Sequence, residues 1–149
     1  MAGASVGIDI QYDTRQIEQA LHRLAKAGQS MDMVFADIGE YLLESTKQRF
    51  ADEVDSDGLP WEPLSSHTHK DRNADRILLE HGDLMDSLHY NSGADHVELG
   101  TNLIYGATHQ FGDDSRNIPA RPFLGISAAD EDTILDLMER HLLDALATA

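Results

Sequence analysis

The stretch Asp57-Gly58-Leu59-Pro60-Trp61-Glu62-Pro63-Leu64 divides the chain, because a helical N-terminal part precedes it and a strand-rich part follows it. The stretch holds the only tryptophan and two of the four prolines. Gly58 suits a turn because glycine tolerates a positive φ angle. Pro60 and Pro63 each remove a backbone donor and favour extended geometry in the residue before them. We therefore predict that the segment is neither a helix nor a central strand.

The indole of Trp61 is expected to pack against another part of the fold, since an extended segment has little other reason to carry an indole. We predict that it fills a groove left by the neighbouring helices, and that its burial contributes about 2–3 kcal/mol. A pinned crossover loop is the favoured interpretation, because aromatic anchors in loops serve packing more often than chemistry. A ligand-binding role for the segment is the alternative.

The length and composition of the chain limit its class. The 149 residues suit one domain, spanning 1–149, with an adequate core. The absence of cysteine excludes a disulfide framework and thiolate chemistry. We expect no signal peptide and no membrane span, since no apolar stretch approaches the ~20 residues that a span needs.

The charge of the chain is strongly one-sided. There are 27 acidic and 11 basic residues, which gives a formal net charge of −16. A surface of this kind repels free nucleic acid and anionic membranes. Three explanations stay open: an acidic passage through which DNA slides without sticking, solubility in a crowded setting, or a salt-adapted host.

The N-terminal part is predicted to hold one strand and two helices. Residues 6–12 alternate between apolar and polar, which indicates a strand with one buried face. Helical spacing then predicts a helix that Gly28 ends and a longer helix from Ser30 or Asp32 to about Phe50. Gly39 lies in the longer helix, where we expect a close helix contact. The expected buried faces are Ile17, Leu21 and Leu24 in the first helix, and Met31, Val34, Phe35, Ile38, Leu42 and Ser45 in the second.

The part after Trp61 is predicted to be richer in strands. Residues 65–75 form a polar, exposed loop, residues 77–79 are a short apolar run, and Asp83 caps one helical turn. Residues 88–91 and 96–100 alternate and form a hairpin through a turn at 92–95. Asn102 is expected to cap a short helix whose apolar residues are Ile104, Tyr105 and Ala107. A polar loop at 113–117 and a final strand near Phe123 follow.

The last helix is expected to begin at a cap made by Ser127 or Asp130, with acidic residues 130–132 complementing the helix dipole. The fold class that these elements predict is α+β, with a small, mostly antiparallel sheet packed with N-terminal helices and a C-terminal helix. The apolar face of the last helix is Ile134, Leu135, Met138, Leu142 and Leu146.

Eight histidines among many carboxylates suggest a metal site, and a metal-dependent hydrolase using His67, His69 and Asp71 is one alternative function. However, His67 and His69 lie on opposite faces of an extended chain. The sequence also lacks the helical histidine spacing of zinc proteases and any cysteine ligand. We therefore favour solvated loop histidines and assign no metal ligand.

Other chemical motifs are also weak. Residues 53–58 resemble the opening of a calcium loop, but Leu64 stands where a bidentate glutamate is required, so a turn is predicted. Neither a Gly-x-Ser-x-Gly nucleophile elbow nor a phosphate-binding loop occurs. We assign no catalytic residue and no cofactor. Arg121 lies between two prolines and is expected to bind a carboxylate of its own or a neighbouring subunit.

Three ordered groups of motifs cover most of the chain. The first is Phe50 with residues 57–64 and Thr68, and the second is Ile77-Leu78-Leu79 with residues 82–84 and 87–88. The third comprises residues 99–102, 105–107 and 109–112 with Ile118-Pro119-Ala120-Arg121-Pro122-Phe123-Leu124-Gly125, and Gly106 is an insertion within it. In this order and spacing the chain resembles the phage virion morphogenesis family, the tail-completion proteins of Mu-type phages, over about residues 6–145.

The resemblance implies a structural virion protein rather than an enzyme. Such proteins complete the tail or neck and join the tail to the DNA-filled head, as rings, commonly hexameric, around the DNA channel. The implied partners are other copies of the chain, head–tail connector or neck proteins, tail tube or terminator proteins, and DNA that passes without sequence-specific binding. The implied location is the neck of the virion after assembly in the host cytoplasm, and no membrane is involved. An assembly adaptor that leaves the finished particle is a further alternative.

The resemblance also implies which positions serve fold and assembly, and no catalytic residue carries over. These positions are Asp57, Gly58, Pro60, Trp61, Leu64, Gly100, Tyr105, Gly112, Pro119, Arg121, Pro122 and Phe123.

Overall fold

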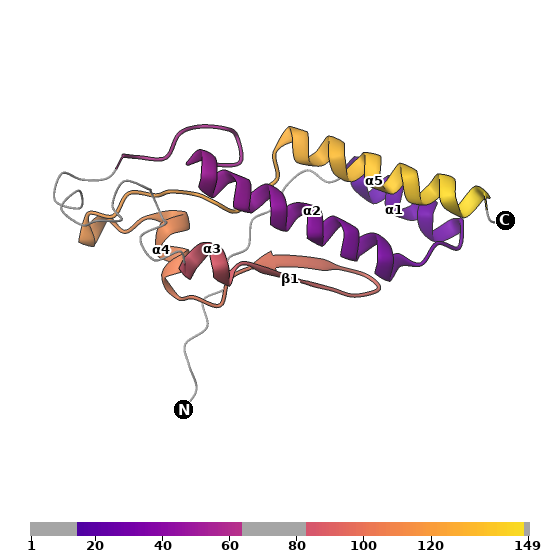
Figure 1. Cartoon of the computed structure of the whole chain (residues 1–149), viewed down its shortest axis with the longest axis horizontal. Coiled ribbons are helices and arrows are strands. Elements are labelled where there is room, and N and C mark those ends of the chain that lie inside the picture. The colour runs from indigo at the N-terminus through magenta and orange to yellow at the C-terminus, as the bar shows by residue number, and fades with distance from the viewer. Residues whose placement is uncertain (1–14, 64–82, 148–149) are drawn as a thin grey trace, which may run out of the picture. The chain divides into compact units, whose positions relative to one another are not determined.

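The computed structural model describes residues 15–63 and 83–147. Within these residues the chain forms five α-helices, one two-stranded sheet and one short 3₁₀ helix. The α+β class is confirmed. In chain order the elements are α1 (Arg15–Lys26), α2 (Met31–Asp52), α3 (Asp83–Ser87), β1 (His89–Ser92), β2 (Val97–Gly100), α4 (Tyr105–Phe111), the 3₁₀ helix η2 (Asp114–Arg116) and α5 (Ala128–Ala147) (Figure 1).

The described residues fall into two compact units. The three-helix unit comprises residues 15–45, 90–99 and 126–147, and the Trp61 unit comprises residues 46–63, 83–89 and 100–125. Helix α2 contributes its first part to the three-helix unit and its last turns to the Trp61 unit. The expectation of one domain over 1–149 stays a prediction.

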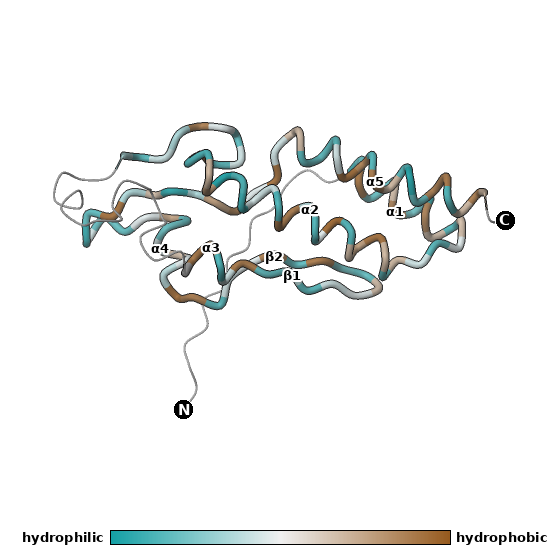
Figure 2. Tube along the Cα trace, in the orientation of Figure 1, coloured by the Kyte–Doolittle hydropathy of each residue, from teal (hydrophilic) through white to brown (hydrophobic). Residues whose placement is uncertain are grey.

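The core of the three-helix unit lies between α1, the first part of α2, and α5. Along each of these helices apolar residues recur among polar ones (Figure 2). The buried residues lie three or four positions apart, which places them on one helix face. They are Ala20 and Leu24 from α1, Val34, Phe35 and Ile38 from α2, and Ile134 and Met138 from α5. The predicted faces are confirmed at these positions apart from Ala20, which was not predicted, whereas Leu146 near the end of α5 is 60% exposed and does not join the core.

The start of α5 is fixed by a reciprocal pair of hydrogen bonds. The Ser127 hydroxyl accepts from the backbone N–H of Asp130 at 2.9 Å, and the Asp130 carboxylate accepts from the backbone N–H of Ser127 at 3.0 Å. Two orphan donors at the helix start are thereby satisfied. The sequence indicated the cap correctly, but it gave the acidic side chains of this turn only a role in compensating the helix dipole.

Asp130 has a second role that the sequence did not reveal. Its side chain is buried, and its Oδ1 accepts from the Tyr41 hydroxyl at 2.9 Å and from the Ser45 hydroxyl at 2.6 Å. Burial and the bond to this carboxylate raise the pKa of Tyr41. One carboxylate therefore caps α5 and links it to the middle of α2.

The predicted hairpin is confirmed, and β1 and β2 are joined by a turn in which Gly93 N–H donates to the His96 carbonyl at 3.0 Å. The close contact expected at Gly39 is also confirmed, but its neighbour is a strand residue and not a helix. A Cβ at Gly39 would lie 2.8 Å from Cγ of the Tyr90 ring. Glycine at this position therefore lets the hairpin approach α2.

One expectation for the following region was wrong. Asn102 does not cap α4, because Ile104 occupies the cap position without a side-chain hydrogen bond, and the Thr101 hydroxyl accepts from the nearby Leu103 N–H at 3.1 Å. Of the apolar residues predicted for this helix, Ile104 and Tyr105 are 61% and 42% exposed. Helix α4 thus directs apolar side chains to its surface.

The final strand predicted near Phe123 is also wrong. Residues 119–127 belong to neither a helix nor a strand. Pro119 and Pro122 have no N–H for a strand ladder, which explains why an apolar segment here does not pair. The polar loop at 113–117 is present and contains η2.

Three predicted features lie outside the described residues: the first strand at 6–12, the polar loop at 65–75 and the apolar run at 77–79. Among the helices that are described, none combines the length and apolar character that crossing a membrane requires.

We expect Gly39→Ala to lower the free energy of unfolding by about 1–2 kcal/mol in urea titrations. Overpacking against Tyr90 costs about 1–3 kcal/mol, while alanine returns up to about 1 kcal/mol of helix propensity. In a Tyr90→Ala background the same substitution should become neutral or stabilising, since the clash is gone. Gly100→Ala is the control, because a Cβ there meets nothing within 4 Å. Equal effects of Gly39→Ala in both backgrounds would contradict this account.

Candidate functional site

Three aromatic rings form the centre of the Trp61 unit. Trp61 is 4% exposed, and its ring meets Phe50 of α2 edge-on with centroids 5.4 Å apart. Phe50 also contacts Phe123 at 5.6 Å, and both phenylalanines are fully buried. The predicted burial of Trp61 is confirmed. Its groove is formed by one helix and an extended segment rather than by helices alone.

The extended segment 118–125 is held by side chains in place of a strand ladder. The Trp61 indole N–H donates to the Pro122 carbonyl at 2.7 Å, and Arg49 Nη1 donates to the Phe123 carbonyl at 3.0 Å. The backbone N–H of Arg121 donates to the carbonyl of His109 at 2.6 Å. Buried backbone groups must find partners, and here tryptophan and arginine supply them.

Gln110 completes this pattern from α4. Its side-chain oxygen accepts from the N–H groups of Phe123 and Leu124, each at 3.0 Å, and its Nε2 donates to the Leu124 carbonyl at 3.2 Å. The side-chain amide therefore makes the hydrogen bonds that the backbone N–H and C=O of a neighbouring strand would otherwise make. Gln110 is buried, so loss of its side chain would leave these backbone groups without their partner.

Arg121 ties the same segment to the chain that follows Trp61. Its Nε donates to the Glu62 carbonyl at 2.8 Å and its Nη2 to the Pro63 carbonyl at 2.9 Å. The side chain is 8% exposed, and this burial lowers the pKa of Arg121. The carboxylate partner that we expected is not among these acceptors, and a contact with a neighbouring subunit stays a prediction. We refer to Arg49, Trp61, Gln110 and Arg121 as the Trp61–Arg121 cluster.

The turn before Trp61 is built around Asp55. Its Oδ1 accepts from the N–H groups of Asp57 and Leu59, each at 2.9 Å, and Gly58 takes a φ of +82°. Pro60 follows in a bridge with Val54. The predicted turn is confirmed. In the part of the chain that the structure describes, no group of three histidine, aspartate or glutamate residues could hold a metal ion.

The glycines at the predicted positions differ in whether a larger residue could replace them. Gly112 ends α4 with a φ of +77°, and a Cβ there would lie 2.7 Å from the Ala120 nitrogen and 2.9 Å from the Ile118 oxygen. Gly106, the insertion relative to the family pattern, is buried, and its Cβ would lie 2.6 Å from Cγ2 of Thr101. Gly100 ends β2 in open space, so packing does not require glycine there.

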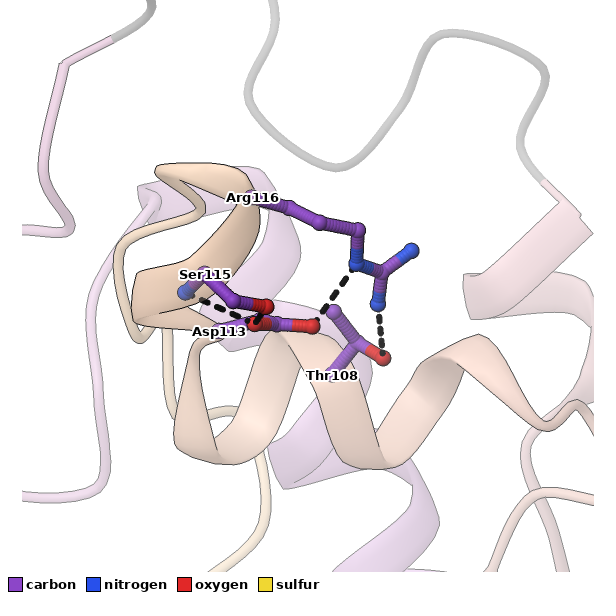
Figure 3. A network of polar contacts seen from close by, with 4 residues as sticks. All are labelled: Thr108, Asp113, Ser115 and Arg116. Carbon is purple, nitrogen blue, oxygen red and sulfur yellow. Dashed lines mark hydrogen bonds and ion pairs between the residues drawn. The ribbon is translucent and has the colours of Figure 1, made fainter.

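The loop after α4 carries a local polar network (Figure 3). The Asp113 carboxylate accepts from the Ser115 hydroxyl at 2.6 Å and from Arg116 Nε at 2.7 Å, and Arg116 Nη2 reaches the Thr108 hydroxyl at 3.4 Å. Hydrogen bonds from Ser115 and Arg116 lower the pKa of Asp113 to about 2. The network therefore fixes the Arg116 side chain over α4 while leaving it 61% exposed.

His109 is a titratable group of this unit whose ring is partly buried. Its Nδ1 is buried and has no hydrogen-bond partner among the described residues. Burial, and next the charge of Arg121, lower the pKa of His109 below its ordinary value of 6.5. Tyr105 covers the ring edge-on at 5.8 Å.

The structure thus brings Trp61, Arg121, Pro122 and Phe123 together, and Pro119 begins the segment that carries three of them. Tyr105 and Gly112 belong to α4 and its end, Asp57, Gly58 and Pro60 to the turn, and Leu64 lies outside the described residues, as do His67, His69 and Asp71. The sequence did not indicate the hydrogen-bonding roles of Arg49, Asp55 and Gln110. Two of these three had a signal, because Arg49 precedes Phe50 in the first motif block and Gln110 lies inside the third.

Comparisons with known proteins identify the family of this chain. The sequence matches the phage virion morphogenesis family over residues 12–143, and the chain belongs to that family. It is 31% identical to a putative capsid assembly protein G of Escherichia phage Mu, over 95% of this chain and 98% of that protein. It is 30% identical to the Mu-like prophage FluMu G protein 1 of Haemophilus influenzae, over 91% of this chain and 94% of that protein.

A shorter match covers 44% of this chain and 55% of an uncharacterized protein of Methanocaldococcus jannaschii, at 32% identity. No solved structure matches the chain. The family supports a structural or assembly role in a phage, as the sequence motifs implied.

We expect Trp61→Ala to lower the free energy of unfolding by about 3–5 kcal/mol, because it removes a buried ring that packs against Phe50. Trp61→Phe should cost less, about 1–3 kcal/mol, since it keeps a ring but removes the donor to the Pro122 carbonyl. Denaturant unfolding of the full chain measures both. Leu59→Ala is the control, because Leu59 is 62% exposed and should change stability by less than about 0.5 kcal/mol. A Trp61→Ala protein as stable as the control would show that the indole does not support the fold.

We also expect the fold to lose stability as the pH falls below the ordinary His109 pKa of 6.5. Above that pH the imidazole is neutral in both states and contributes nothing. Below it the unfolded chain binds a proton that the folded chain resists, so the free energy of unfolding decreases. His109→Gln should reduce the loss between about pH 8 and about pH 5. His96, whose pKa its bond to Asp95 raises, acts in the opposite direction and is retained in both proteins, so only the difference between them is read. Identical pH profiles would refute the role of His109.

Proposed function

We propose that this protein is a structural subunit that completes the tail or neck of a tailed phage and joins the tail to the DNA-filled head. It acts as a hexameric ring around the DNA channel. The observation that carries the proposal is the match to a virion morphogenesis family over residues 12–143. The Mu relative, a putative capsid assembly protein G, matches this chain over 98% of its own length.

The positions of the motif residues support a structural role. Trp61, Arg121 and Phe123 are buried and are used to hold backbone segments together. Residues with such tasks stabilise a subunit, and a subunit of fixed shape is what a repeating assembly requires. Contacts with neighbouring proteins would then be made by residues on the outer surface.

The charge supports the proposed position around DNA. A net charge of −16 disfavours binding to phosphate, so DNA can pass an acidic lumen without being retained. The proposed partners are further copies of the chain, the head–tail connector or neck proteins on one side, and the tube or terminator proteins on the other. The proposed location is the neck of the virion, reached after assembly in the host cytoplasm.

The test combines the isolated protein with the particle. Native mass spectrometry and electron microscopy of the purified full-length chain should give a closed ring, and quantitative mass spectrometry of purified virions should give a copy number matching the ring. A phage lacking the protein should accumulate heads and tails that do not join.

Two results would contradict the proposal. A protein absent from finished virions whose loss still blocks joining would be an assembly adaptor that leaves the particle. A protein that stays monomeric at all concentrations, with or without its neighbours in the particle, would not be a ring subunit.

A further inference from the structure

One face of α4 carries exposed apolar side chains in a regular row. Ile104, Thr108 and Phe111 are spaced i, i+4 and i+7, which places them on the same side of the helix. Ile104 and Phe111 are each 61% exposed. Large apolar side chains presented together in this way mark interaction surfaces more often than isolated ones do.

Arg116 adds a positive charge to this row. Its guanidinium lies over Thr108, because Nη2 donates to the Thr108 hydroxyl and Nε donates to the Asp113 carboxylate (Figure 3). An arginine fixed in this way loses little freedom when it binds a partner. We refer to Ile104, Phe111 and Arg116 as the α4 surface.

A surface of opposite character lies between α1 and α5. A groove of about 520 Å³ has Leu24, Leu135, Met138, Leu142 and Leu143 among its lining residues. Its lining also includes Asp136 and Glu139 from α5 and Arg23 from α1. Leu143 is 58% exposed. We refer to this feature as the α1–α5 groove; its lining combines apolar side chains with two carboxylates of α5.

We propose that the α4 surface of one copy docks into the α1–α5 groove of a second copy, with Ile104 and Phe111 on the leucines and Arg116 facing Asp136 and Glu139. The choice of a second copy rests on charge complementarity. With 27 acidic and 11 basic residues, most contacts between copies are repulsive, and this pairing places a cation against carboxylates. An aromatic residue and an arginine are also the types enriched in the centres of interfaces.

The pairing has a geometric consequence. Each copy carries both surfaces, so the contact is head-to-tail, and such contacts generate either closed rings or open filaments. The inference rests on the proposed ring and assigns the residues of its subunit interface.

The test is a charge exchange in the full-length chain, read by analytical ultracentrifugation. Arg116→Glu and the double variant Asp136→Arg/Glu139→Arg should each weaken self-association by about tenfold or more. The chain that carries all three substitutions should regain much of the wild-type association, because the charges are opposite again. Restoration of this kind is not expected from unrelated damage to two surfaces.

Mixing the defective proteins gives a sharper readout. Arg116→Glu keeps an intact groove, and Asp136→Arg/Glu139→Arg keeps an intact α4 surface. In the mixture the intact α4 surface meets the intact groove, and the reversed α4 surface meets the reversed groove. An equimolar mixture should therefore assemble beyond the dimer, while each variant alone stays dissociated.

Phe111→Asp serves as a second variant that leaves the Asp113–Arg116 network in place, and it should weaken association by about 10- to 100-fold. Met33→Asp is its matched control, because Met33 is 60% exposed on α2 and lies outside both surfaces. Circular dichroism of each variant confirms that it is folded.

Several outcomes would overturn the inference. They are full assembly of Arg116→Glu and Phe111→Asp, equal loss with Met33→Asp, failure of the charge exchange to restore association, or a wild-type protein that never self-associates. Rings that persist in Arg116→Glu and Phe111→Asp would refute this interface while leaving the proposed function intact. Wild-type protein that is absent from virions would refute the proposed function itself.

Discussion

The backbone groups of residues 121–124 set the constraint on which the Trp61 unit depends. Pro119 and Pro122 keep this segment extended and prevent a regular ladder, yet its amides and carbonyls lie in the interior, where each needs a partner. Arg49, Trp61 and Gln110 provide those partners from three separate parts of the chain. Arg121 then binds the carbonyls beside Trp61, so the segment and the loop fix each other.

This arrangement explains the character of the family motifs. A motif of prolines, an arginine, a phenylalanine and glycines looks like a binding loop, because such residues often surround ligands. Here the arginine hydrogen-bonds main-chain oxygens and the phenylalanine packs against Phe50, and both are buried. Gly112 allows the backbone of residues 118–120 to come close to the end of α4. The motifs therefore specify the shape of the folded chain, whereas Ile104 and Arg116 of the proposed α4 surface lie outside them.

The elements that depend on the spacing of apolar residues could be predicted from the sequence. The segments that depend on hydrogen bonds between distant residues mostly could not. Helices α1, α2 and α5 and the β1–β2 hairpin were found because apolar residues repeat at helical or strand spacing. The burial of Trp61 followed from an indole between prolines. In contrast, the segment near Phe123 was mistaken for a strand, since a run of apolar residues does not reveal whether its backbone pairs with a neighbour. Gln110 and Asp130 gave no periodic signal, because their partners lie in other elements of the fold. Arg121 was expected to bind a carboxylate, but its acceptors in the structure are the carbonyls of Glu62 and Pro63.

The double use of Asp130 decides where α5 comes apart first. Helices ordinarily fray at both ends, because the terminal turns have the fewest hydrogen bonds. At the Ser127 end, fraying would remove the Asp130 carboxylate from the Tyr41 and Ser45 hydroxyls of α2 and would also break the capping hydrogen bonds. At the other end, Leu143 and Leu146 are already largely in water and little is lost when the turn opens. The last helix is therefore held more firmly at its beginning than at its tip, so the tip can change its course with little effect on the interior.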